Sequence, residues 1–118
     1  MTFLMTQFIA GAGGNAKTQQ TLEANIRTRS LAVGEFLARQ GEPAPNLYFI
    51  AKGLVKMFYI TADGKEFVKS FIREGQITGS LSALMEGGDS TFSIVCLEPV
   101  TAEVVPAPVF TEIGRAHV

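Results

Sequence analysis

The sequence contains one cysteine, one histidine and no tryptophan. A single cysteine excludes a disulfide framework, and it also excludes a zinc or iron–sulfur site built from four cysteines within these 118 residues. A single histidine excludes a multi-histidine metal site and leaves a Ser-His-Asp triad hard to build. We therefore expect no catalytic residues, no bound metal and no enzymatic activity in this chain.

Charge of either sign is also scarce. The 10 lysines and arginines nearly balance the 11 aspartates and glutamates, so the formal net charge is −1. This balance argues against nucleic-acid binding by the domain itself, because phosphate binding needs a clustered basic surface. With 47% hydrophobic and 18% charged residues, the composition is that of one folded domain rather than a disordered tail.

Long hydrophobic runs are missing as well. No stretch approaches the roughly 20 apolar residues that span a bilayer. The apolar N-terminus has no basic residue before Lys17, so it is a poor signal peptide. A lone cysteine without an export signal favours the cytoplasm, and we expect a cytoplasmic protein with no membrane partner.

The two ends of the chain differ from its middle. Residues 1–30 are predicted to form a glycine-rich leader and a helix over 16–28, in which Leu22 and Ile26 make a thin apolar stripe. Residues 31–110 are predicted to form the folded domain. The tail 111–118 contains EIGRAHV, which resembles the translation of a sequencing-library adapter, and we interpret it as an artefact. The alternative is an ordinary frayed C-terminus, and either interpretation leaves His117 without a role.

Short β-rich runs separated by glycine turns dominate the middle of the chain. Strands are expected at 35–40, 47–52, 54–61, 66–72, 91–98 and 100–105, within a total of about seven. This spacing is typical of a β-sandwich or barrel. The pair Asp63-Gly64 predicts a hairpin turn, because both residues tolerate positive φ. Residues 80–85 predict one helical turn, for which Thr78 or Ser80 could be the N-cap.

Several of these segments follow one another in a specific order. They are Gly34–Glu42, Leu47–Ile50, Gly53–Val55, Asp63–Glu66, the glycines Gly75 and Gly79, and Phe92–Glu98. This succession, over Leu31–Val109, resembles the cyclic nucleotide-binding domain of CRP/FNR-type bacterial transcription regulators. The resemblance implies a mainly β, double-stranded β-helix (jelly-roll) sensor with a short N-terminal helix and one short helix in the pocket region.

The resemblance also implies partners. In such regulators a long dimer helix and a winged helix-turn-helix follow the barrel, and neither follows here. The expected partners are therefore a second copy in the full-length protein, and DNA only through the missing C-terminal domain. The remaining partner would be a small-molecule effector of unknown identity.

The family's phosphate-binding cassette has degenerate counterparts in this sequence. The family's Gly-Glu-Leu step corresponds to Gly79-Ser80-Leu81, so a serine replaces the glutamate that accepts the ribose hydroxyl. The family's Arg-Ser/Thr pair corresponds to Ser90-Thr91, so a serine replaces the arginine that pairs with the phosphate. These five residues are the candidate ligand-binding residues. We expect no cofactor, and ordinary cyclic AMP binding is disfavoured.

The remaining conspicuous residues are expected to be structural. Cys96 lies in an apolar run and is predicted to be a buried core residue. Solvated positions on the barrel exterior are expected for Lys52, Lys56, Lys65, Lys69 and Arg73, and core positions for Phe49, Phe58, Phe67, Phe71 and Phe92.

Two other functions stay open from the sequence. The same sensor fold could be the regulatory module of a kinase, channel or transporter, because a fold does not fix the output. A cupin-type enzyme on a related jelly roll is less favoured, because metal cupins need a histidine-rich motif that this sequence lacks.

Overall fold

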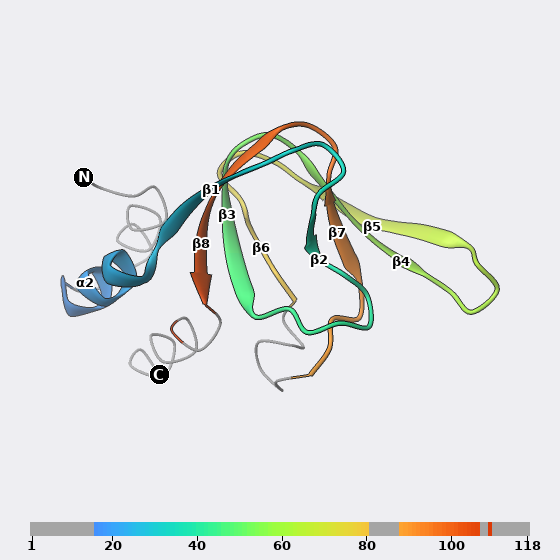
Figure 1. The fold of residues 1–118 in the computed structure, drawn as a ribbon, viewed down its shortest axis with the longest axis horizontal. Coiled ribbons are helices and arrows are strands. Elements are labelled where there is room, and N and C mark those ends of the chain that lie inside the picture. Colours follow the sequence, from blue (N-terminus) through green and yellow to red (C-terminus); the bar gives the residue numbers. More distant parts are fainter. Residues whose placement is uncertain (1–15, 81–87, 107–108, 110–118) are drawn as a thin grey trace.

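Two four-stranded antiparallel sheets form the molecule (Figure 1). The computed structural model describes residues 16–80, 88–106 and 109. The elements are α2 (Ala16–Asn25), β1 (Arg27–Leu31), β2 (Phe36–Ala38), β3 (Asn46–Lys52), β4 (Val55–Ile60), β5 (Glu66–Ile72), β6 (Ile77–Thr78), β7 (Ser93–Cys96) and β8 (Val100–Pro106). The first sheet has the order β1-β8-β3-β6 and the second β2-β7-β4-β5. The predicted mainly β jelly-roll fold is confirmed.

The N-terminal helix is shorter than the sequence pattern predicts. α2 ends at Asn25, and Arg27–Leu31 forms the edge strand β1. The predicted helix over 26–28 is therefore wrong. β1 pairs with β8 along its whole length, from Arg27 opposite Val104 to Leu31 opposite Val100. Pairing with this neighbouring strand outweighs a weak helical pattern, because short isolated helices are only marginally stable.

The short strand β6 was also not expected. Thr78 pairs with Tyr48 of β3, so it lies in a strand and is not the N-cap of a helical turn. The predicted turn at 80–85 falls largely outside the described residues, and so do the glycine-rich leader, Leu81 and the tail 111–118.

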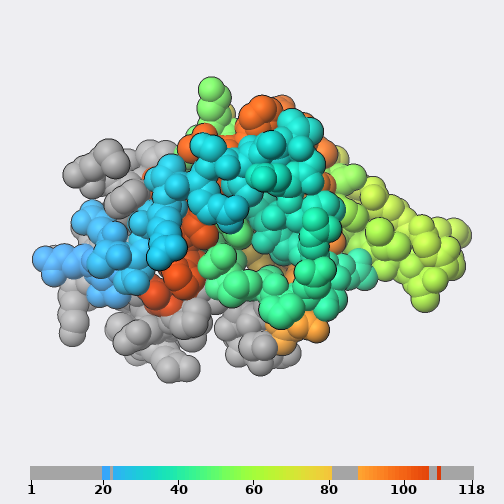
Figure 2. Space-filling model, viewed as in Figure 1, coloured from blue at the N-terminus to red at the C-terminus, as the bar shows by residue number. Residues whose placement is uncertain are grey.

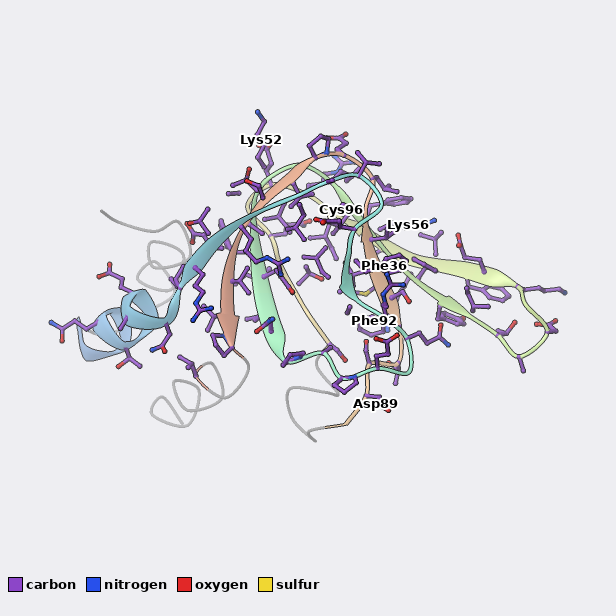
Figure 3. The ribbon with its side chains drawn as sticks, viewed as in Figure 1. Phe36, Lys52, Lys56, Asp89, Phe92 and Cys96 are labelled. Atoms are coloured by element: carbon purple, nitrogen blue, oxygen red, sulfur yellow. The ribbon has the colours of Figure 1, made fainter. Side chains whose placement is uncertain are left out.

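The core lies between the two sheets. Four strands each contribute a residue with no exposed surface to this core: Ile50 from β3, Val55 from β4, Ile94 from β7 and Ala102 from β8. Cys96 is 1% exposed, which confirms its predicted core position (Figure 3). Burial raises the pKa of its thiol, the nearby Glu35 carboxylate raises it further, and Arg29 opposes the shift.

β4 and β5 form the predicted hairpin at Asp63-Gly64. Gly64 N–H donates to the Thr61 carbonyl at 2.9 Å, and Gly64 has a φ of +84°. Only the glycine has positive φ, so the loop is a type I turn followed by a glycine bulge, rather than a two-residue turn with both φ angles positive. The hairpin projects from the body of the molecule (Figures 1 and 2).

Two aromatic side chains of the edge strand β5 lie in solvent. Phe67 is 44% exposed and Phe71 is 51% exposed, so their predicted core positions are wrong. Phe49 and Phe58 are buried, as predicted. Phe67 lies opposite Tyr59, past the last pair between β4 and β7, whereas Phe71 lies opposite Lys56 near the base of the hairpin, on the edge strand β5. Strand alternation alone does not show either exposure, because it carries no information on which strands lie alongside.

Candidate functional site

A cavity of about 560 Å³ lies between the two sheets. Its lining comes from strands β3 to β6 and from the segment that leads into β7. The lining residues are Leu47, Met57, Lys69, Ser70, Ile72, Ile77, Thr78, Gly79, Thr91 and Phe92. The volume is in the range of small-molecule sites, and most of the wall is hydrophobic, as such sites usually are.

The structure brings two of the five candidate residues to this cavity. Gly79 and Thr91 line it, whereas Ser80 and Ser90 are buried and are not among its lining residues. Leu81 lies outside the described residues. Ligand binding by these residues stays a prediction.

Gly79 is a glycine because of its close approach to β3. A Cβ at this position would lie 2.9 Å from Leu47 Cδ1 and 3.2 Å from the Asn46 carbonyl oxygen. Both distances are shorter than ordinary van der Waals contact, so a side chain here would push the wall of the cavity outward. Gly79 therefore sets how closely the end of β6 packs on β3.

Ser90 is held by the backbone of the loop between β2 and β3 and by its own turn. Its N–H donates to the Glu42 carbonyl and its carbonyl accepts from Gly41 N–H, both at 2.8 Å. Its hydroxyl donates to the Phe92 carbonyl oxygen at 2.6 Å. The side chain that replaces the family's arginine is thus engaged in a turn that orients Phe92, which lies beside the loop carrying Asp89 in Figure 3.

Two lining residues, Lys69 and Thr78, were not among the predicted ligand-binding residues. Lys69 was expected on the solvated exterior, and although it is exposed, it lines the cavity. Its ammonium lies 5.0 Å from the centre of the Phe92 ring. Thr78 is 4% exposed, and its hydroxyl oxygen has no hydrogen-bond partner in the described part of the chain. The signal available in the sequence was a lysine at a position that alternates with Phe67 and Phe71, where a hydrophobic residue would be expected.

A β-bulge explains the position of Lys69. On β4 and β5, Met57 pairs with Ser70 and Phe58 pairs with Val68, so Lys69 is the extra residue without an opposite partner. Bulges redirect the side chain of the extra residue. In regular alternation Lys69 would share the outer face with Phe71.

The described residues show no feature that points to a metal centre or a membrane span. No group of three or more metal-binding side chains occurs among them. Within the same residues, no helix is long and apolar enough to cross a bilayer.

The sequence matches the cyclic nucleotide-binding domain family over residues 28–117. The chain belongs to the cyclic nucleotide-binding domain family. It is 32% identical over 77 residues to the cAMP-activated global transcriptional regulator CRP of Salmonella typhimurium. The matched segment covers 63% of this chain and 37% of the relative. It is 33% identical over 81 residues to the acetyltransferase Pat of Mycolicibacterium smegmatis, covering 69% of this chain and 24% of the relative.

Solved structures agree on the fold. The catabolite activator protein of Thermus thermophilus superposes with a TM-score of 0.74 at 21% identity, covering 88% of this chain and 48% of the other. Of the two curated relatives described above, the chain matches only 37% and 24% of the length. It is a cyclic nucleotide-binding domain with relatives among regulatory proteins.

Proposed function

We propose that this chain is the effector-sensing domain of a CRP-type transcription regulator in the cytoplasm. The similarity to CRP supports the regulator assignment, and the cavity between the sheets supports the sensing role. The full-length protein is a homodimer in this proposal. DNA contact belongs to a part of the protein outside this domain, because the domain has balanced charge.

The effector in this proposal is not cyclic AMP bound in the ordinary way. The observation that carries this is Ser90, whose hydroxyl is already bonded to the Phe92 carbonyl where the family has an arginine. Ser80 replaces the glutamate that accepts the ribose hydroxyl in the family. Each lost charge-assisted hydrogen bond costs roughly 1.5–3 kcal/mol. The two losses together weaken binding by about a hundredfold or more.

Calorimetric titration of the purified protein with cyclic AMP and cyclic GMP tests this proposal. We expect no binding tighter than roughly 100 μM for either nucleotide, given the two lost interactions. A matched variant, Ser90→Arg with Ser80→Glu, restores both charges, and its tighter binding would show that the pocket is otherwise competent. Low-micromolar affinity of the unaltered protein would overturn the proposal.

A second candidate is the same sensor joined to a different output. The similarity to the acetyltransferase Pat favours it, because that relative carries a matching segment. Reading the source DNA past residue 110 separates the two candidates. A long amphipathic helix followed by a helix-turn-helix pattern supports the regulator, and a catalytic domain supports the second candidate.

A further inference from the structure

The cavity has one cationic side chain at an otherwise apolar wall. Leu47, Met57, Ile72 and Ile77 supply aliphatic and thioether surface, and Phe92 supplies a ring. The lining contains no arginine, aspartate or glutamate among the described residues. Lys69 is therefore the only charged group that the described wall offers to a ligand.

Lys69 has no anionic partner in the structure as described. The ion pairs among the described residues join Lys56 to Glu66 at 3.0 Å and Lys65 to Asp63 at 3.9 Å. The contact recorded for the Lys69 ammonium is the face of the Phe92 ring, 5.0 Å away. A cation–π contact of this kind leaves the ammonium able to bind an anion, because the ring takes up only one side of it.

A second polar group in the wall also lacks a partner. The Thr78 hydroxyl oxygen is buried and has no hydrogen-bond partner among the described residues. Unsatisfied buried hydroxyls are rare in folded proteins, and water or a ligand commonly supplies the missing bond. Thr78 lies on β6 and Lys69 on β5, so the two lining residues come from different sheets. The Thr78 oxygen itself is inaccessible to solvent, so the Lys69 ammonium is the group on which a charged ligand would act.

We propose that this cavity binds a small organic acid with one carboxylate on an apolar body, and that the Lys69 ammonium binds the carboxylate. The proposal rests on the proposed sensing function and names the chemical class of its effector. A lysine is a compact point charge suited to a single carboxylate. A sugar phosphate fits this wall less well, because the described lining has no acidic acceptor for ribose hydroxyls and no forked guanidinium for a phosphate.

The test compares an acid with its neutral amide. Phenylbutanoate and phenylbutanamide have nearly the same shape, and they differ in the charge that Lys69 would bind. Both are titrated into the purified protein and two variants by calorimetry. Lys69→Met removes the ammonium and keeps an unbranched side chain. Lys65→Met is the matched control, because Lys65 is an exposed lysine at the tip of the same hairpin, and it does not line the cavity.

We expect the acid to bind the unaltered protein about tenfold or more tightly than the amide, the size of one charge-assisted hydrogen bond. Lys69→Met should reduce acid binding to the level of the amide and leave amide binding unchanged, and Lys65→Met should change neither. Equal binding of acid and amide, unchanged acid binding in Lys69→Met, or no binding of either compound would overturn the proposal.

The cyclic nucleotide titrations distinguish the two proposals. Nucleotide binding in the low-micromolar range, lost in Lys69→Met, would overturn both proposals, because Lys69 would then serve a phosphate. Acid binding that depends on Lys69, with no nucleotide binding, supports both. Absence of both acid and nucleotide binding overturns only the organic-acid assignment.

Discussion

At the scale of single residues, Gly53 stands where two constraints meet. Its φ is +109°, a conformation that side chains disfavour. A Cβ there would also lie 2.6 Å from the Pro99 carbonyl oxygen and 2.9 Å from Val100 Cγ2. Gly64 shares the positive φ, at +84°, but it has open space around it. Comparing Gly53 with Gly64 therefore separates the cost of positive φ, which both share, from the cost of a steric clash, which only Gly53 has.

The substitutions Gly53→Ala and Gly64→Ala measure these two costs. Gly64→Ala should destabilise the protein by about 1–2 kcal/mol, the cost of an alanine in the left-handed region. Gly53→Ala should cost roughly 3 kcal/mol or more, because the backbone carbonyl of Pro99 must move as well. Urea unfolding of both variants gives the two free energies. Equal losses would mean that the contact with Pro99 relaxes freely.

At the scale of elements, β4 and β5 carry one buried and one exposed phenylalanine on their outer face. Phe58 is 6% exposed, its ring lies 6.4 Å from the Phe36 ring, and the Lys56 ammonium lies 4.8 Å above it. Phe71, on the same face, is half exposed. The two residues are of the same type, so the difference lies in their strands: Phe58 is on the inner strand β4, next to β7, and Phe71 is on the edge strand β5.

Alanine at each position tests that statement. Phe58→Ala should destabilise the protein by about 3–5 kcal/mol, the usual cost of removing a buried phenylalanine. Phe71→Ala should change the free energy of unfolding by less than about 1 kcal/mol, as exposed substitutions do. Urea unfolding of both variants gives the two free energies of unfolding, and they can be compared if the denaturant dependence of the free energy (the m-value) is unchanged. A large loss for Phe71→Ala would contradict its solvent-exposed placement.

The local sequence pattern predicts a strand when the strand and the turns on either side of it lie in one short stretch of sequence. β5 spans Glu66–Ile72, the expected residues, because glycine turns on both sides delimit it. β1 was missed because four of its five residues are exposed and its partner β8 lies some seventy residues away in sequence. The site was only partly predictable for a different reason. The bulge that brings Lys69 to the cavity lies within one hairpin, and the Ser90 hydroxyl bonds to a carbonyl only two residues away, but regular strand alternation announces neither feature.

At the scale of the whole molecule, Cys96 reports on opening of the core. It is the only cysteine, and it is 1% exposed. A disulfide reagent at mildly alkaline pH should modify it at least about a hundredfold more slowly in the folded protein than in concentrated urea, because opening of a stable core is rare. Fast modification of the folded protein would show that β7 opens locally.

The same thiol gives stability a pH dependence of known sign. Its pKa is raised by burial in the folded state, so the unfolded chain loses the proton first as pH rises. The contribution is fully present below about pH 8.5, the ordinary value of the thiol pKa, and it is lost as the pH rises through the folded value. The Cys96→Ala variant, measured alongside, should lack this part of the alkaline decline.

The antiparallel pairing of β1 with β8 also governs how the domain responds to tension. Arg27 lies opposite Val104, so the chain enters β1 and approaches the end of β8 at the same end of this strand pair (Figure 1). A pull applied to these two points loads the hydrogen bonds one after another, as in a zipper, rather than all together in shear. β1 is an edge strand, so it would peel away while β8 stays paired with β3. The edge of the first sheet is therefore the mechanically weak element of the domain.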